Sequence, residues 1–191
     1  DPEMSRGLGD VYKRQELEKT EGGSYMERRD KVNYYLDLAE MVSQRSTCLR
    51  KHYGAVIVNN DEVISTGYVG APRGRKNCSD IGRCIREELH VPRGERYELC
   101  RSVHAEANAV LNYRGSLKDL EGSTVYVTLF PCHDCAKILA QVGVGEVVYL
   151  DNKYADTDDG RISRRILDSC GISYRQVIVD VQIGTGGQAQ Q

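Results

Sequence analysis

A Cys-x-x-Cys motif lies between a predicted strand and a predicted helix, and it is the feature that most narrows the possible folds. The apolar run at 124–129 is followed by Pro131, Cys132 and Cys135, and a helical pattern continues over 136–140. Two cysteines one helical turn apart at a helix N-terminus can bind the same metal ion, and the helix dipole favours their thiolate forms. The stretch therefore predicts a strand–turn–helix unit that holds a metal.

A second motif, His104-Ala105-Glu106, opens another predicted helix. One histidine and two cysteines leave a tetrahedral zinc ion one open position for water. Glu106 is too close in sequence to His104 to bind the same ion comfortably, but it is well placed to take a proton from that water as the catalytic base. His-x-Glu followed by Pro-Cys-x-x-Cys is the signature of zinc nucleobase deaminases. A structural zinc or a redox pair is the alternative for the two cysteines, and a redox role leaves His104 and Glu106 unexplained.

Hydrophobic periodicity and turn residues predict the remaining elements. Helices are expected at 27–43, 104–113 and 161–169, and strands at 54–58, 63–68, 124–129, 146–150 and 172–183, the last with a break near Gln176 as an alternative. A tight turn at 59–61 joins the first two strands as a hairpin. The strand–helix–strand order near the C-terminus implies parallel strands with a right-handed crossover. The predicted fold class is therefore α/β, a three-layer α/β/α sandwich on a mixed five-stranded sheet.

One domain is expected at 26–183, and it contains a Cys-rich insertion at 70–101. Residues 1–25 are aperiodic, and we expect them to be disordered and not native. The segment 10–15 is the translation of a transposon adapter used in sequencing libraries, so we exclude this end from the prediction of the fold. Residues 184–191 are predicted to be a flexible tail.

Composition narrows the class of protein. No apolar run approaches membrane-spanning length, and a net charge of -2 argues against a nucleic-acid partner. Seven cysteines without a secretion signal are typical of metal ligands in a reducing compartment. We therefore expect a cytoplasmic protein with no membrane contact.

With these residues in view, the chain resembles the deoxycytidylate (dCMP) deaminase family of the cytidine deaminase-like superfamily. The resemblance runs over about 32–176 and rests on Arg45-Ser46-Thr47-Cys48, Gly54-Ala55-Val56-Ile57-Val58, Gly67-Tyr68-Val69-Gly70, Val103-His104-Ala105-Glu106-Ala107-Asn108-Ala109, Tyr126-Val127-Thr128-Leu129-Phe130-Pro131-Cys132 and Tyr154-Ala155-Asp156. It implies a hydrolase acting on cyclic amidines, which converts dCMP to dUMP and ammonia and supplies the precursor of thymidylate. Members are commonly hexamers that dCTP activates and dTTP inhibits, so a homo-oligomer and these effectors are the implied partners.

The resemblance also implies contacts to the nucleotide. The backbone N–H of Ala105 would meet the pyrimidine O2, and the backbone near Ala55 would meet the amino group. Asn108 and Tyr154 are placed in the nucleotide site by the same resemblance. Family members usually have Asn where this chain has Val69, a departure that concerns substrate choice and the effector response but not the zinc chemistry.

A compact basic cluster, Arg73, Arg75 and Lys76, lies on a glycine-containing loop of the insertion. Such a cluster suits a nucleotide phosphate, so we expect it to bind the substrate's phosphate. The alternative is a solvated basic loop.

The insertion region also holds enough ligands for a second metal. Some bacterial and phage dCMP deaminases carry a structural zinc here, which would keep a long loop ordered. The expected ligands are Cys48, Cys78, Cys84 and Cys100, with His90 as the alternative to one of them. Buried free thiols are the other interpretation.

Other functions remain open at this point. A deaminase of another cytosine nucleoside or nucleotide, or of adenosine in tRNA, would use the same scaffold. A catalytically silent zinc-binding assembly partner would use the same metal site, although the chain retains all four of its catalytic residues. Among the remaining cysteines and histidines, we expect Cys170 to be a packed thiol, His133, between the two cysteine ligands, to face solvent rather than the metal, and His52 to lie on the surface.

Overall fold

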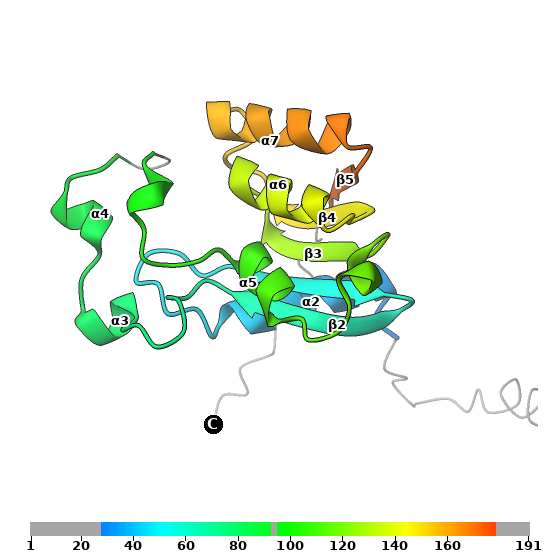
Figure 1. The fold of residues 1–191 in the computed structure, drawn as a ribbon, viewed down its shortest axis with the longest axis horizontal. Helices are drawn as coiled ribbons and strands as arrows, with labels where there is room; N and C mark the ends of the chain where they lie inside the picture. Colours follow the sequence, from blue (N-terminus) through cyan, green and yellow to red (C-terminus); the bar gives the residue numbers. More distant parts are fainter. Residues whose placement is uncertain (1–27, 93–94, 179–191) are drawn as a thin grey trace, which may run out of the picture.

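The computed structural model describes residues 28–92 and 95–178. Its five strands form one mixed sheet in the order β2-β1-β3-β4-β5 (Figure 1). β1 pairs antiparallel with β2 and β3, whereas β3, β4 and β5 are parallel. The strands are β1 (Gly54–Asn59), β2 (Glu62–Tyr68), β3 (Thr124–Leu129), β4 (Glu146–Asp151) and β5 (Ser173–Gln176). The predicted mixed five-stranded sheet, with its parallel C-terminal strands, is confirmed.

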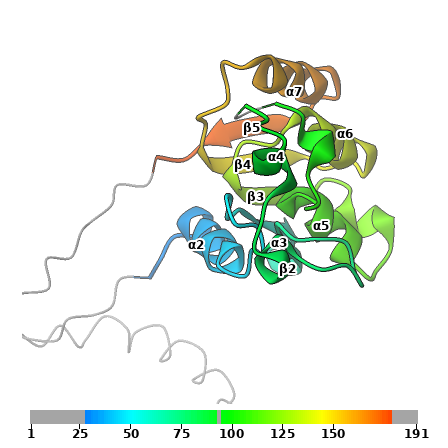
Figure 2. The same cartoon turned by 90° about the vertical axis from the view of Figure 1, so that its left-hand side faces the viewer.

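Helices cover both faces of this sheet. Alternate residues of β1 serve the two hydrophobic clusters, with Val56 and Val58 in one and Ala55 and Ile57 in the other. The first cluster packs under α2, and α5, α6 and α7 lie on the opposite side, as Figure 2 shows. These helices are α2 (Lys31–Ser43), α5 (Ala105–Asn112), α6 (His133–Gln141) and α7 (Asp158–Ser169). The predicted three-layer α/β/α sandwich is therefore confirmed.

The hairpin turn has the geometry that its sequence requires. Asn59 pairs with Glu62, which leaves Asn60 and Asp61 as a two-residue loop. Both loop residues have positive φ, at 50° and 65°. Positive φ at both central positions is the signature of a type I′ turn, which Asn and Asp tolerate better than most residues.

One predicted helix boundary is wrong. α7 begins at Asp158 rather than residue 161, because the Thr157 hydroxyl caps the helix by accepting the Gly160 N–H at 3.2 Å. β5 ends at Gln176, where a break in the last strand was expected, and 179–183 lie outside the described residues, so a continuation to residue 183 stays a prediction.

The predicted N-terminal segment and C-terminal tail, 1–25 and 184–191, also lie outside the described residues, so the domain limits stay a prediction. Within the described part of the chain, no helix is both long and apolar enough to cross a membrane.

The insertion leaves and rejoins the fold at one point. Gly70 and Val103 form an isolated antiparallel bridge, with N···O distances of 3.2 and 2.8 Å. Between them lie three short helical turns, α3 (Cys78–Ile81), α4 (Ile85–Glu88) and η1 (Tyr97–Leu99). They stand beside the sheet in Figure 1. The region predicted as irregular is therefore a loop with short helical turns, closed at its base.

Close packing at Gly67 fixes the start of α5. A Cβ atom at this position of β2 would lie 2.2 Å from the carbonyl oxygen of Ala105 and from the amide nitrogen of Ala109. Only glycine permits so close an approach of helix and strand. This contact positions the N-terminus of α5, where the His-x-Glu motif lies.

Candidate metal centre and catalytic pocket

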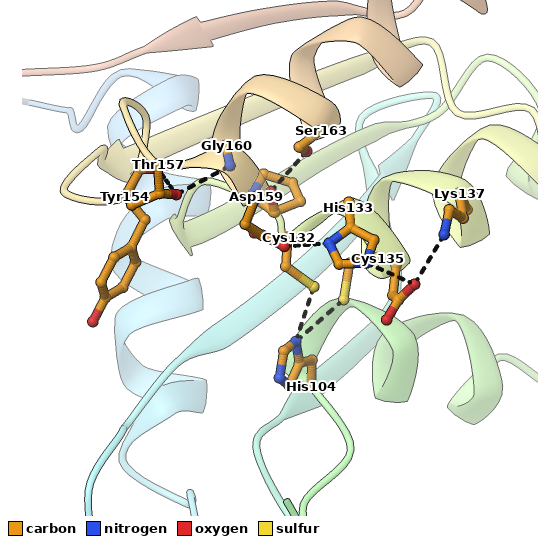
Figure 3. Close-up of polar contacts among 12 residues, drawn as sticks. His104, Cys132, His133, Cys135, Lys137, Tyr154, Thr157, Asp159, Gly160 and Ser163 are labelled. Atoms are coloured by element: carbon orange, nitrogen blue, oxygen red, sulfur yellow. Dashed lines mark hydrogen bonds and ion pairs between the residues drawn. The ribbon is translucent and has the colours of Figure 1, made fainter. Parts of the chain in front are cut away.

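Two helix N-termini meet at one place and bring the two motifs together. His104 precedes α5 and Cys132 precedes α6, each as the extended N-cap residue of its helix. Cys135 follows one turn later in α6. The Sγ atoms of Cys132 and Cys135 lie 3.3 and 3.6 Å from His104 Nδ1, as Figure 3 shows. The fold thus assembles residues that are about thirty positions apart in the sequence.

This triad fits a zinc ion. Zn–N bonds of about 2.05 Å and Zn–S bonds of about 2.3 Å at tetrahedral angles place N and S about 3.6 Å apart. The observed N···S separations match that edge, and all three ligand atoms lie within 4.8 Å of one another. With three protein ligands, a tetrahedral ion keeps a position for water, which is the arrangement of catalytic zinc sites.

The three ligand residues share their protons unequally when no metal is bound. Burial opposes the imidazolium, but the hydrogen bond and charge of Cys132 raise the pKa of His104 to about 9. A hydrogen bond from Cys135, assisted by His104, lowers the pKa of Cys132 despite its burial. The same bond and burial raise the pKa of Cys135. Without metal the centre therefore holds an imidazolium–thiolate pair and a neutral thiol, and metal binding must displace protons.

Glu106 lies in the first turn of α5 and points toward the same centre. Its side chain is 8% exposed, and the thiol of Cys135 donates to Oε2 at 3.5 Å. Burial raises the pKa of this carboxyl, while the charge of His104 opposes the shift. A buried carboxylate whose pKa is raised is suited to accept and return a proton near neutral pH.

A pocket opens in front of the triad and Glu106. Ala105 and Tyr154 line it. Ala55 does not, although its neighbour Gly54 does. Asn108 does not line it either, because its side chain donates to the Tyr68 carbonyl oxygen at 2.7 Å. The amide of Asn108 thus joins α5 to β2.

The predicted phosphate cluster does not line this pocket. Arg73 donates to Asn112 Oδ1 at 3.1 Å, and Arg75 and Lys76 line a separate hollow together with Arg101. Their phosphate role stays a prediction.

Sequence reasoning missed several pocket residues. Arg50 and Lys51 line the pocket, and Arg86 and Tyr97 reach it from the insertion. The basic run at 50–52 is a visible signal, but the sequence predicts a position only for His52, which is exposed as expected and does not line the pocket. Arg86 and Tyr97 lie in a region without periodicity, so nothing in the sequence marks them.

A second layer of contacts holds the cysteine loop. His133 is 35% exposed and is not among the three clustered ligand residues, in line with the prediction that it faces solvent rather than the metal; its Nδ1 also pairs with Asp159 at the start of α7. The buried Ser163 hydroxyl donates to the Pro131 carbonyl oxygen at 2.8 Å. Both contacts join α7 to the segment that carries Cys132 (Figure 3). The predicted packed thiol at Cys170 is exposed instead.

The insertion thiols are gathered but do not form a second compact ligand group. Cys48, Cys78 and Cys84 are buried and Cys100 is partly so. Burial and the neighbouring Cys48, Cys100 and Cys84 raise the pKa of Cys78, although a Ser102 hydrogen bond opposes the shift. Among the described residues, His104, Cys132 and Cys135 are the group of three or more potential metal ligands whose ligand atoms all lie within 4.8 Å of one another. The four insertion thiols do not form such a group. The alternative ligand His90 is exposed.

Comparison with known proteins agrees with this geometry. The family model for the cytidine and deoxycytidylate deaminase zinc-binding region matches residues 29–151. Deoxycytidylate deaminase of Homo sapiens is 34% identical over 146 residues, which covers 76% of this chain and 78% of the relative. The probable deoxycytidylate deaminase of Drosophila melanogaster is 37% identical over 153 residues, covering 76% and 71%. The crystal structure of dCMP deaminase from the cyanophage S-TIM5 in complex with dCMP and dUMP is 28% identical, with a TM-score of 0.59, and covers 80% of this chain and 100% of that one.

Proposed function

Because the chain belongs to the cytidine and deoxycytidylate deaminase family, we propose that it hydrolyses dCMP to dUMP and ammonia. In the cell this reaction supplies the precursor of thymidylate. The observation that carries the proposal is the buried carboxyl of Glu106 beside the His104–Cys132–Cys135 triad, at the base of an open pocket. A catalytically silent partner would have no need to keep this carboxyl buried and poised.

The residues of the pocket divide the reaction between them. His104, Cys132 and Cys135 would hold a zinc ion, which would supply a water molecule acidic enough to ionise near neutral pH. Glu106 would take one proton from the attacking water and give it to N3 as the water oxygen bonds to C4 of cytosine. It would then carry the second proton to the amino group, so that the C4–N bond breaks and ammonia leaves. The backbone N–H of Ala105 would hold the pyrimidine O2, and the backbone near Ala55 the amino group.

A second, structural zinc is a further part of this proposal. Three of the four predicted thiols are buried, and the Arg50 backbone N–H donates to Cys48 Sγ at 3.4 Å. Backbone N–H groups that bond a thiolate support it as a metal ligand. A zinc-to-protein ratio near two in the purified protein would support the second site, and a ratio near one would reject it.

Assembly and regulation complete the proposal. We expect a cytoplasmic homo-oligomer, a hexamer by family resemblance, with dCTP as activator and dTTP as inhibitor. The free thiols fit a reducing compartment. The hollow lined by Arg75, Lys76 and Arg101 offers a triphosphate a basic surface. Sedimentation with and without dCTP tests the oligomeric state. Activity measured at increasing concentrations of dCTP and of dTTP tests the regulation.

The test of the main proposal is ammonia release with dCMP, deoxycytidine and cytidine, with Glu106→Gln as the blank. Turnover of dCMP that the blank lacks would support the proposal. Turnover of the nucleosides in preference to dCMP would mean that the same chemistry acts on another cytosine substrate. Val69→Asn would then be the first variant to test. A tRNA substrate is disfavoured by the net charge of -2.

A further inference from the structure

The residues on both sides of Cys132 are tied to α7. Ser163 of α7 donates its hydroxyl to the carbonyl oxygen of Pro131 at 2.8 Å. His133 donates through Nδ1 to Oδ1 of Asp159, which lies in the first turn of α7, as Figure 3 shows. Cys132 therefore lies between two residues whose positions α7 helps to set.

The start of α7 is itself held in place, so it can serve as a fixed support. A Cβ atom at Gly160 would lie 2.3 Å from the carbonyl oxygen of Tyr154, so the loop before the helix passes as close as glycine allows. The Thr157 hydroxyl accepts the Gly160 N–H at 3.2 Å and caps the helix. Asp159 lies inside this tight turn, and its side chain is 20% exposed. Its carboxylate is therefore presented by a backbone that has little freedom to move.

The three ligands of the triad are fixed in different ways. Cys135 lies one turn inside α6, where the helix itself directs its side chain. His104 is the N-cap residue of α5, and the close packing of α5 on β2 sets its position. Cys132 is the N-cap residue of α6, and its φ of -71° and ψ of 167° lie outside the helical range. Helix geometry therefore determines its direction least, and the contacts of residues 131 and 133 with α7 supply the missing constraint.

Two carboxylates meet the ring of His133, and they differ in exposure. Nε2 lies 3.3 Å from Oδ1 of Asp134, whose side chain is 70% exposed, and water weakens such a contact. The partner of Nδ1, Asp159, is far less exposed and also lines the catalytic pocket. Asp159 is therefore the partner that can fix the ring, and it joins the pocket wall to the loop that carries Cys132.

We propose that Asp159, acting through His133, is a positioning residue for Cys132 in the metal centre. The pair keeps Sγ of Cys132 at the distance from Nδ1 of His104, 3.3 Å, that binding of one zinc ion by both atoms requires. Residues that orient metal ligands from outside the ligand shell typically change metal affinity or activity by about 10- to 100-fold. This role concerns the metal site alone and is independent of which pyrimidine the pocket accepts.

The test measures how fast the zinc-loaded protein gives up its metal to an excess of chelator, in the absence of substrate. Cys132→Ser protein identifies the phase of release that belongs to the triad. In Asp159→Ala this phase should be about 10- to 100-fold faster than in the parent. Asp159→Asn keeps an oxygen acceptor for the His133 ring N–H and should stay within a few-fold of the parent.

Asp158→Ala is the matched control for this measurement. Asp158 is the neighbouring acidic residue in the first turn of α7, it is 89% exposed, and it pairs with Arg161. The change removes the same charge from the same helix N-terminus but leaves the contact between Asp159 and His133 in place. It should not alter the rate of zinc release.

Cobalt in place of zinc reports the geometry of the ligands directly. In Asp159→Ala the thiolate-to-cobalt charge-transfer band should weaken or shift, because Cys132 is no longer held toward the ion, whereas Asp158→Ala should keep the spectrum of the parent. His133→Ala should reproduce the rate and the spectrum of Asp159→Ala. The double variant should be no worse than either single change, because both act through one contact. His133→Ala also carries the test if Asp159→Ala fails to fold.

Three results would overturn the inference. One is a folded Asp159→Ala variant with the zinc-release rate and cobalt spectrum of the parent. Another is an Asp159→Asn variant that loses zinc as fast as Asp159→Ala, since the charge would then matter and not the hydrogen bond to His133. The third is a double variant in which the effects of the two single changes add. A parent protein that binds zinc through the triad but does not deaminate dCMP would defeat the proposed function and leave these measurements unaffected.

Discussion

Replacing Glu106 by Gln should remove turnover and leave the metal centre intact. The side chain is 8% exposed, and its one hydrogen bond in the described structure is from Cys135 at 3.5 Å. An amide fills the same space but cannot take a proton. General acid–base groups contribute about 10²- to 10⁴-fold each, and this one handles two transfers, so we expect a loss near 10⁴-fold. That corresponds to a barrier higher by about 5 kcal/mol.

The assay is ammonia release from dCMP, with zinc content measured on the same preparation. Glu62→Gln, at an exposed position of β2, is the control and should behave as the parent. Turnover within a few-fold of the parent would refute the role of Glu106. Loss of zinc together with activity would equally refute it, because the carboxyl would then support the metal and not the proton transfer.

Three further changes test the architecture of the site. Cys132→Ser should reduce bound zinc by one equivalent per chain and activity to background, as measured by metal analysis and ammonia release. Gly67→Ala should destabilise the fold by about 1–3 kcal/mol in urea unfolding and lower activity, because the new methyl overlaps the Ala105 carbonyl. Ser163→Ala should cost about 1–3 kcal/mol in the same experiment, since the buried Pro131 carbonyl loses its donor, while a cost near zero would contradict this.

The metal site was predictable because each of its parts is a local pattern. His104 and Cys132 are both N-cap residues, and Cys135 and Glu106 follow within the first helical turn. Helix starts are encoded in a few neighbouring residues, so their side-chain directions follow from the sequence. The sheet was predictable for a similar reason, because buried strands and a two-residue turn have clear periodic signals.

The basic residues that line the pocket were not predictable in this way. Proximity in sequence made Arg73, Arg75 and Lys76 look like one site, but none of them lines the pocket, and Arg75 and Lys76 line a separate hollow. Arg50 and Arg86 are thirty-six positions apart, yet both line the pocket, and Glu87, the neighbour of Arg86, pairs with Arg50. Such a contact depends on how an aperiodic insertion packs, which no local pattern records.

The two pocket arginines each follow a predicted zinc ligand by two residues. Arg50 follows Cys48 and donates its backbone N–H to that sulfur, and Arg86 follows Cys84, the N-cap residue of α4. If a structural zinc holds these cysteines, it also holds the side of the pocket that Arg50 and Arg86 line. Cys78→Ser should then raise KM for dCMP at least tenfold while kcat for deoxycytidine changes little, because the catalytic triad lies on α5 and α6. Equal loss of activity on both substrates would show that the insertion stabilises the whole fold and has no separate influence on that side of the pocket.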